Sequence, residues 1–296
     1  MINAGRDLQN MSLPLVIHRT LRWAVRCLAV GLLAGIPPSM WAIESGSTIN
    51  TSDPGTPPWN YVGAIGDASG VYLGDYDGIN WVLTASHVGP GNFVLNGITY
   101  DAINGSGITL TNPNGSLTDL TLFRIRGAPG LANLAIESQD QPIGTAVQMI
   151  GFGGGSRSWA TNTIYGYTQY SLGGTPYLGE GILTLASRGA QGMGGDSGGG
   201  TFVQTADGTW ELAGILSGVG EIRTLMGTDL GQGTVAADVA TYSNQINATI
   251  ASTAIPEPAD YAALLGLFAL SITSIARVAR PPRPLAKRNP QHARAT

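Results

Sequence analysis

Ser197 and His87 are the residues of this sequence whose types and surroundings best fit a chemical reaction. Acyl transfer from a serine needs a base that takes its proton, a third group that holds the base, and amide donors for the oxyanion. Ser197 stands in the run Gly-Gly-Asp-Ser-Gly-Gly-Gly of residues 194–200, where glycines let the backbone turn sharply and present its N–H groups. His87 directly follows the strand-like run of residues 81–86. The two residues therefore predict a nucleophile and its base.

The other histidines lie far from this part of the chain. Of the three histidines in the sequence, His18 is close to the N-terminus and His292 is close to the C-terminus, so only His87 lies in the body. The alternative for His87 is a buried, hydrogen-bonded structural role, and the alternative for Ser197 is a simple turn residue.

Asp119 is the preferred third group because it opens the apolar run of residues 120–123. Asp101 and Asp75 are the alternatives, but neither of them opens an apolar strand. Residues 75–80 share a few positions with a calcium-binding loop and lack the rest of that pattern, so we expect a hairpin turn there. The sequence contains no other ligand cluster, and we expect no metal and no organic cofactor.

Composition and charge limit the class of protein. The chain has 296 residues, of which 43% are hydrophobic, 11% are charged and 43 are glycine, so it can bury a sizeable core but is poor in helix-favouring residues. Between positions 43 and 255 there are five basic and sixteen acidic residues, a formal net charge of −11. Such a surface repels nucleic acid and anionic lipid, so we expect no nucleic-acid partner.

Short apolar runs alternate with Gly, Asn and Asp turns, which is typical of an all-β barrel or sandwich. Residues 47–58 have the composition of an extended lead-in, and residues 235–251 have the apolar spacing of a terminal helix. The predicted strands are residues 70–73, 81–84, 108–111, 120–125, 147–151, 182–186, 201–204 and 212–217.

The N-terminal segment has the features of a secretory signal peptide. Arginines at 19, 22 and 26 precede an apolar run at 27–36, which prolines end, and small residues lead to Ala42. We predict a signal peptide over 1–42 with cleavage after Ala42, because the apolar run is short for a transmembrane helix, which is the alternative. The only cysteine, Cys27, lies inside this segment, so we expect no disulfide and no thiol chemistry in the mature protein.

At the other end, Pro-Glu-Pro at 256–258 is followed by an apolar stretch at 261–276 and then by a basic tail. This order resembles the PEP-CTERM sorting signals of Gram-negative bacteria, although the basic tail is longer than usual. The resemblance implies a sorting segment over 253–296, a transmembrane helix at about 261–276, recognition by an exosortase-type machinery, and export to the cell surface or the medium. A simple C-terminal membrane anchor predicts the same surface location.

The central motifs resemble those of trypsin-like, chymotrypsin-fold serine proteases. Thr84-Ala85-Ser86-His87 is similar to the Thr-Ala-Ala-His box of that family, and Gly-Asp-Ser-Gly-Gly at 195–199 is similar to its nucleophile motif. Residues 118–123 look like the Asp box of the family, and the order His, Asp, Ser is the family order. The resemblance covers about residues 43–252. It implies two antiparallel Greek-key β-barrels with the site between them.

Roles follow from the resemblance residue by residue. Ser197 would attack the scissile carbonyl, His87 would carry the proton, and Asp119 would hold the imidazole. The N–H groups of Gly195 and Ser197 would form the oxyanion hole. Ser217 and Gly218 would line the substrate strand, with a more open wall because the family usually has Trp where Gly218 stands. Gln191 matches the family's primary specificity position, where it is neither acidic nor clearly apolar, so the cleavage preference stays open.

In the family that these motifs resemble, the aspartate before the nucleophile pairs with a newly formed N-terminal ammonium, and the resemblance implies the same for Asp196. Cleavage after Ala42 would expose Ile43, which lies 44 residues before His87, a spacing similar to that of the family. We therefore expect that export creates the activating amine and that Ile43 pairs with Asp196, because a buried carboxylate needs a partner.

Together these expectations describe an all-β protein with a short C-terminal helix. Its predicted parts are the signal peptide, an extended lead-in over 43–54, a protease domain over 55–252 and the sorting segment. The first barrel is expected over 55–142, and the second barrel with the terminal helix over 143–252. The predicted function is a secreted or surface-attached serine endopeptidase acting on polypeptides. The alternatives are a catalytically silent binding protein of the surface or biofilm matrix, and an esterase using the same triad.

Overall fold

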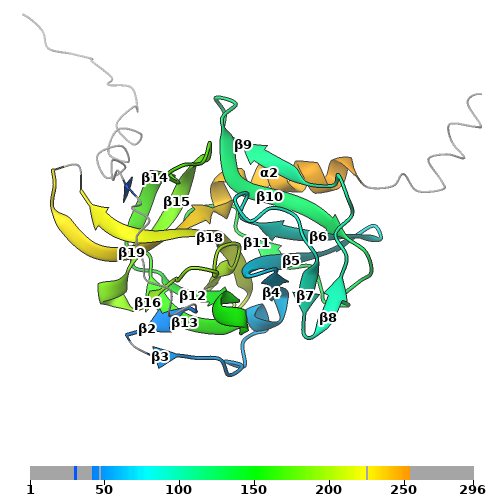
Figure 1. Cartoon of the computed structure of the whole chain (residues 1–296), viewed down its shortest axis with the longest axis horizontal. Coiled ribbons are helices and arrows are strands. Elements are labelled where there is room, and N and C mark those ends of the chain that lie inside the picture. Colours follow the sequence, from blue (N-terminus) through cyan, green and yellow to red (C-terminus); the bar gives the residue numbers. More distant parts are fainter. Residues whose placement is uncertain (1–29, 32–41, 47, 225, 254–296) are drawn as a thin grey trace, which may run out of the picture. The chain divides into compact units, whose positions relative to one another are not determined.

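The computed structural model describes residues 30–31, 42–46, 48–224 and 226–253. Their strands form two large curled sheets, a small third sheet and one C-terminal helix, so the all-β expectation with a terminal helix is confirmed (Figure 1). The predicted signal segment lies almost entirely, and the predicted transmembrane segment entirely, outside the described residues. Within the described residues, no helix is long and apolar enough to cross a membrane.

The first sheet has seven strands in the order β8-β7-β4-β5-β6-β10-β9. It positions His87, which follows β6, and Asp119, which lies in β10. Its strands are β4 (Val62–Ile65), β5 (Ala68–Tyr76), β6 (Ile79–Thr84), β7 (Phe93–Leu95), β8 (Ile98–Tyr100), β9 (Ile108–Thr111) and β10 (Leu117–Ile125).

The second sheet runs β1-β14-β15-β19-β18-β17-β12-β13, with β11 paired to β18. The serine lies three residues before β17 of this sheet. Its strands are β1 (Val30–Gly31), β11 (Ala135–Ile136), β12 (Ala146–Gly151), β13 (Ser158–Thr163), β14 (Gly166–Ser171), β15 (Leu178–Leu185), β17 (Gly200–Gln204), β18 (Trp210–Arg223) and β19 (Asp229–Asp238).

A third sheet joins the start of the described body to the segment before the serine. It contains β16 (Ala190–Gln191), β2 (Glu44–Ser45) and β3 (Thr48–Ile49), in the order β16-β2-β3. The short 3-10 helices η1 (Pro57–Tyr61), η2 (Gly153–Gly155) and η3 (Ala186–Arg188) complete the connections.

All eight strand segments predicted from the sequence lie in observed strands, apart from single residues at their ends. The predicted turn at 75–80 is also confirmed as the β5–β6 hairpin. Asp77 and Gly78 both have positive φ there, as a tight two-residue hairpin turn requires, and the Gly78 N–H donates to Asp75 Oδ1 at 2.7 Å.

The start of the terminal helix was predicted four residues too early. Helix α2 spans Val239–Ser252, whereas residues 235–237 pair with β15 at the end of β19. Asp238 caps the helix by accepting from the Ala240 N–H at 3.1 Å, so the cap rather than the apolar spacing sets the boundary.

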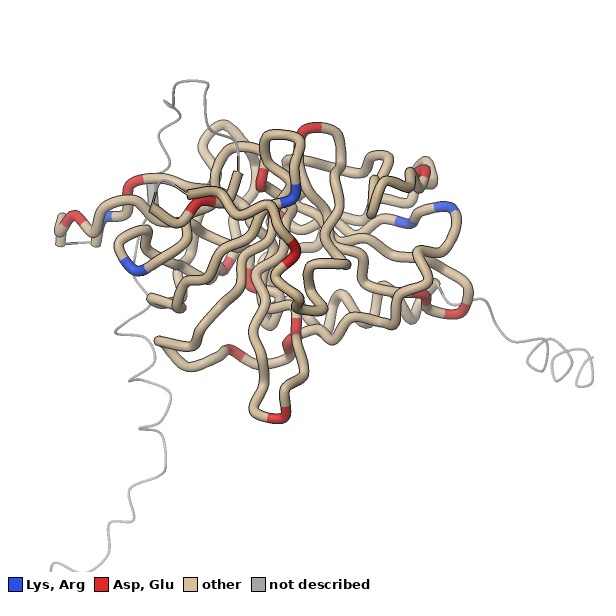
Figure 2. The backbone as a smooth tube through the Cα atoms, turned by 90° about the horizontal axis from the view of Figure 1, so that it is seen from below, with Lys and Arg blue, Asp and Glu red and all other residues tan. Residues whose placement is uncertain are grey.

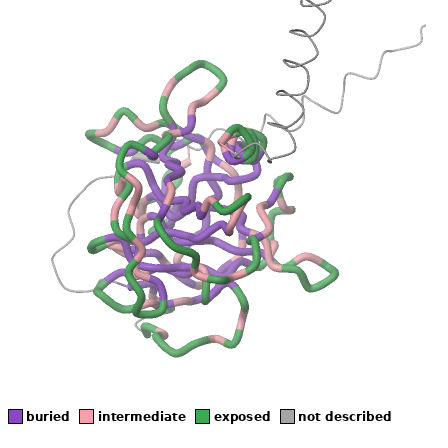
Figure 3. Tube along the Cα trace, turned by 90° about the vertical axis from the view of Figure 1, so that its right-hand side faces the viewer, coloured by how far each residue is buried: buried purple, intermediate pink, exposed green. Residues whose placement is uncertain are grey.

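Buried residues line the interior of both sheets, and exposed residues gather on the connecting loops (Figure 3). The main apolar cluster includes Leu83 and Leu120 from the first sheet with Phe202 and Ile215 from the second, so it is continuous between them. Figure 2 shows acidic positions spread along the chain and few basic ones. The shared core therefore fixes the positions of the chain segments that carry the candidate site.

Candidate active site

Antiparallel pairing of β6 with β10 brings His87 and Asp119 together. In that pair Thr84 lies opposite Thr121, so the turn after β6 reaches the start of β10. The His87 ring Nδ1 lies 2.9 Å from Asp119 Oδ2 and 3.0 Å from Oδ1, and the His87 backbone N–H donates to Oδ1 at 3.0 Å. The carboxylate therefore holds both the ring and the backbone of the histidine.

His87 and Asp119 differ in exposure, as expected for a general base and the carboxylate that orients it. Asp119 is fully buried, whereas the His87 side chain is 26% exposed. Of the two alternative carboxylates, Asp75 accepts from Gly78 in the hairpin turn and Asp101 is exposed. Asp119 is thus the aspartate that the fold places against the histidine.

Ser197 lies in a tight loop, residues 192–199, which we call the nucleophile loop. The loop is closed by bonds from Asp196 N–H to Met193 O at 3.1 Å and from Gly199 N–H to Asp196 O at 2.9 Å. Gly195 and Gly198 have φ of 91° and 83°, which side chains other than glycine rarely adopt. The glycines flanking the serine are therefore required by the turn.

Contacts between the sheets place this loop against the strand that leads to His87. A Cβ on Gly198 would overlap Ser69 O and Thr84 Oγ1, so the residue after the serine touches the end of β6. Thr84 is three residues before His87, and its hydroxyl donates to Ser69 O at 2.8 Å. Within the described residues there is no hydrogen bond between the His87 ring and the Ser197 hydroxyl. Hydrogen bonds between catalytic groups are often long in unliganded sites.

The N–H groups of Gly195 and Ser197 have no acceptor among the described residues. Both belong to the turn that presents the serine, so they are available to an oxygen atom placed beside it. Two backbone donors in one turn can bind an anion together, so the oxyanion role expected from the sequence stays a prediction.

Asp196 is buried and is held by backbone donors. Its Oδ2 accepts from the Met193 N–H at 2.8 Å and its Oδ1 accepts from the Gly153 N–H at 3.0 Å. Burial raises the pKa of Asp196 to about 7, against the lowering effect of the N–H groups of Met193, Gly153 and Ile43. No side-chain cation contacts this carboxylate among the described residues.

Ile43 lies beside Asp196 although the two residues are 153 positions apart in the sequence. Its side chain is fully buried in the core of the second sheet, and its backbone N–H donates to Ser158 Oγ at 2.9 Å. Directly after it, Glu44 pairs with Gln191 and Ser45 pairs with Ala190. The start of the described body is therefore fastened to the segment that leads into the nucleophile loop.

A small cavity of about 60 Å³ opens beside the serine. Ser197, Ser217 and Gly218 all line it, so the structure brings these three predicted residues together. Gln191 lies in β16, paired with Glu44, and is not among the lining residues, which begin at Gly192.

Sequence analysis missed Tyr170 and Ser69. The Tyr170 hydroxyl lies 3.0 Å from Ser217 Oγ, and burial together with the nearby Asp119 charge raises its pKa well above the usual value. The Ser69 hydroxyl accepts from the Phe152 N–H at 2.8 Å and donates to Gly195 O at 3.3 Å. Both lie in ordinary strand sequence, and no local signal marks them.

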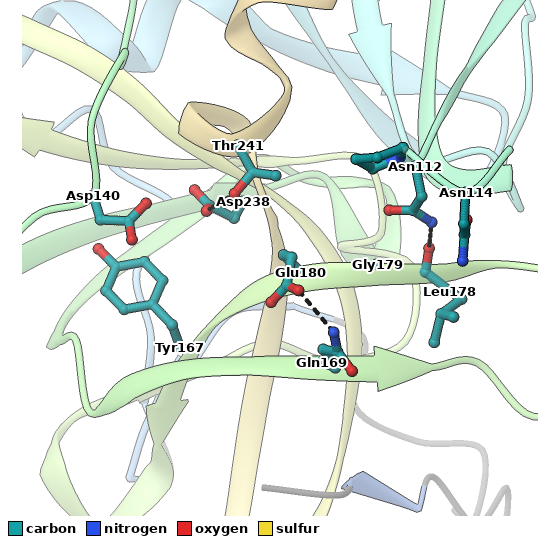
Figure 4. A pocket seen from close by; sticks show the side chains of 11 residues that line it. Asn112, Asn114, Asp140, Tyr167, Gln169, Leu178, Gly179, Glu180, Asp238 and Thr241 are labelled. Carbon is teal, nitrogen blue, oxygen red and sulfur yellow. Dashed lines mark hydrogen bonds between the residues drawn. The ribbon is translucent and has the colours of Figure 1, made fainter. Parts of the chain in front are cut away.

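A larger cavity of about 410 Å³ lies between the β9–β10 loop, β14, β15 and the start of α2, and it shares no lining residue with the cavity beside the serine. The carboxylates of Asp140, Glu180 and Asp238 line it (Figure 4). Burial raises the pKa of Asp238 to about 6. No group of three or more His, Cys, Asp or Glu in the described part of the chain is arranged to hold a metal ion.

No protein-family pattern matches this sequence, and no curated protein does. Solved structures give weak matches. The Rv3671c protease of M. tuberculosis in its inactive form is 16% identical and has a TM-score of 0.46, with the match covering 68% of this chain and 98% of that chain. Neuropsin, a serine protease of mouse brain, is 18% identical, with 68% and 98% coverage and a TM-score of 0.44. The NS6 protease of murine norovirus 1 is 16% identical, with 66% and 97% coverage and a TM-score of 0.44.

Proposed function

We propose that this chain is an exported serine endopeptidase in which Ser197, His87 and Asp119 act as a catalytic triad. The observation that carries the proposal is the contact of both Asp119 oxygens with His87 Nδ1, at 3.0 and 2.9 Å. A carboxylate at Nδ1 leaves the other ring nitrogen, Nε2, free to take a proton from a hydroxyl. The Thr84–Ser69–Gly198 contacts hold the serine loop against the end of β6, three residues before His87, which supports the proposal.

In the proposed reaction, Ser197 Oγ forms a bond to the carbonyl carbon of the substrate while its proton passes to His87 Nε2. The negative charge that develops on the carbonyl oxygen is met by the N–H groups of Gly195 and Ser197. The C–N bond then breaks, and the His87 proton goes to the leaving amine. Water, deprotonated by His87, releases the acyl group from the serine, which recovers its proton.

The proposed activation step uses Asp196 and Ile43. In the uncleaved chain the neutral N–H of Ile43 is one of three amides that act on the buried carboxylate. Cleavage after Ala42 would replace this amide with an ammonium at the same place, which supplies the missing countercharge. Because Ala42 and Ile43 are both buried in the folded protein, this cleavage has to precede folding, as it does when a signal peptide is removed during export.

Export and surface attachment are part of the proposal and rest on the terminal sequences. Residues 1–42 would direct export, and residues 253–296 would be read by an exosortase-type machinery and held by the membrane. N-terminal sequencing of the exported protein tests the first step. A mature start at Ile43 supports the activation step, and a start well away from Ile43 overturns it.

Two measurements separate the proposed function from its alternatives. A fluorophosphonate probe should label the exported wild-type protein and fail to label a Ser197→Ala variant, whereas a binding protein without turnover would leave both unlabelled. A digest of a peptide library should then yield products with the wild type alone. A wild-type protein that is labelled and hydrolyses esters, but cleaves no peptide, would instead be an esterase.

A further inference from the structure

We infer that the enzyme cleaves after residues with small aliphatic side chains, namely alanine and valine, because Val219 and Thr234 close the cavity beside Ser197. This inference rests on the proposed function and names its substrate class. The residue whose carbonyl is attacked must place its side chain next to the serine, and the cavity lined by Ser197 is the recess that receives it.

The size of the cavity sets the first limit. Its volume is about 60 Å³. An apolar protein cavity of about 150 Å³ is known to accept benzene, so a phenyl or phenol ring is too large for this one. A methyl or isopropyl group fits the space that the structure offers.

Two facing side chains form one part of the cavity wall. Val219 in β18 pairs directly with Thr234 in β19, and both of them line the cavity. A Cβ built on Gly192 would lie 3.1 Å from Thr234 Cγ2 and 3.4 Å from Val219 Cγ1, so these three residues meet at one point. The Gly192 N–H also donates to Thr234 Oγ1 at 2.9 Å in a buried position, which fixes the threonine in this orientation.

A bulge in β18 creates this arrangement. Leu216 lies opposite Ala236, but Gly218 lies opposite Val235, so Ser217 is an extra residue in the strand. Without the bulge, Val219 would lie opposite Gly233, and the wall would lose the methyl group of Thr234. The bulge therefore sets the register in which Val219 lies opposite Thr234 in the wall of the cavity.

Charge sets the second limit. Asp196 is the one charged residue that lines the cavity, and its two oxygens are already occupied by the N–H groups of Met193 and Gly153. A lysine or arginine side chain would enter an otherwise uncharged recess without a free carboxylate to meet it, which is costly. The cavity therefore favours an uncharged and small side chain.

The test uses the exported protein and a series of peptidyl anilides that differ only in the residue before the scissile bond. Alanine and valine substrates should have kcat/KM values at least about tenfold above those of phenylalanine and lysine substrates. A phenylalanine or lysine substrate that equals the alanine substrate overturns the inference while leaving the peptidase proposal intact. Absence of both hydrolysis and fluorophosphonate labelling overturns the peptidase proposal, and the inference with it.

Variants of the wall then assign the preference to named residues. Val219→Gly should open the cavity and raise the phenylalanine-to-alanine ratio of kcat/KM by about tenfold or more, whereas Val219→Thr, which has nearly the same shape, should keep the ratio of the wild type. Thr234→Ser removes only the methyl group and should shift the ratio in the direction of Val219→Gly. Labelling by the fluorophosphonate shows whether each variant is folded and reactive. Reactive Val219→Gly protein with the wild-type ratio would contradict the inference.

Discussion

The backbone N–H of Ser69 donates a 2.8 Å hydrogen bond to the carbonyl oxygen of Ser197, which joins β5 of the first sheet to the nucleophile loop of the second. The Ser69 hydroxyl adds bonds to Phe152 and Gly195, and its carbonyl accepts from Thr84. Ser69 thus binds both the nucleophile loop and the end of β6, and it fixes their positions relative to each other.

Replacing Ser69 by alanine should weaken the attachment of the nucleophile loop to β5, because it removes the hydrogen bonds of the Ser69 hydroxyl. The variant keeps the backbone bond to Ser197 but leaves the part-buried Phe152 N–H without its acceptor, which typically costs about 1 kcal/mol. Urea unfolding should show this loss, and the rate of fluorophosphonate labelling should fall as the loop loosens. Ser252→Ala, which removes an exposed bond near the end of α2, should change stability by less than about 0.5 kcal/mol. Equal effects of the two variants would count against the role of Ser69.

Gly198→Ala tests the close contact between the sheets. Its Cβ would overlap Ser69 O and Thr84 Oγ1 at a φ of 83°, so strain and overpacking add to a cost of about 3 kcal/mol or more. Gly115→Ala is the matched control, because Gly115 has a φ of 82° and open space around its Cβ position. It should cost only about 1–2 kcal/mol. Thermal unfolding compares the two variants, and similar losses would show that the contact is not close.

Asp119→Asn should remove activity without unfolding the protein. An asparagine amide facing His87 Nδ1 favours the wrong ring tautomer, which in a triad lowers kcat by about 10⁴-fold. Circular dichroism should show an intact fold. Asp101→Asn changes an exposed carboxylate that does not contact the histidine, and it should leave kcat unchanged. A fully active Asp119→Asn protein would exclude Asp119 from the triad.

Glu137 should make stability depend on pH. Its side chain is buried, and burial raises its pKa from 4.5 to about 7, partly opposed by the nearby Gln141 side chain. The folded protein holds this proton more tightly than the unfolded chain. The contribution is therefore fully present below pH 4.5 and is lost as the pH rises to about 7.

Glu137→Gln keeps the shape and removes the titration. Relative to the wild type, the variant should gain unfolding free energy steadily between pH 4.5 and pH 7, with no further gain above pH 8. Urea unfolding at intervals of one pH unit measures the difference. A constant difference across this range would show that folding does not raise the pKa of Glu137.

The sequence predicts the parts of this fold that depend on local patterns. The strands were predicted correctly from their apolar runs and turns. His87, Asp119 and Ser197 were selected from their immediate neighbours; the structure brings Asp119 to His87, and the role of Ser197 stays a prediction. The helix start was wrong because residues 235–237 suit a strand as well as a helix, and only their pairing with β15 decides between them.

The cavity beside the serine could not be predicted in the same way. Its wall depends on the register between β18 and β19, which a single extra residue at Ser217 shifts by one position. Counting along the chain pointed instead to Gln191, which the structure places in β16 outside the cavity lining. Tyr170 and Ser69 could not be predicted either, because their hydrogen-bond partners are distant in sequence.

The distance between His87 Nε2 and Ser197 Oγ in a crystal structure of the exported protein tests the central claim most directly. The account predicts a separation of about 2.6–3.2 Å, with the Asp119 carboxylate at Nδ1 as described here. An Oγ atom turned away from the ring, with another group filling the space between them in the mature protein, would contradict it.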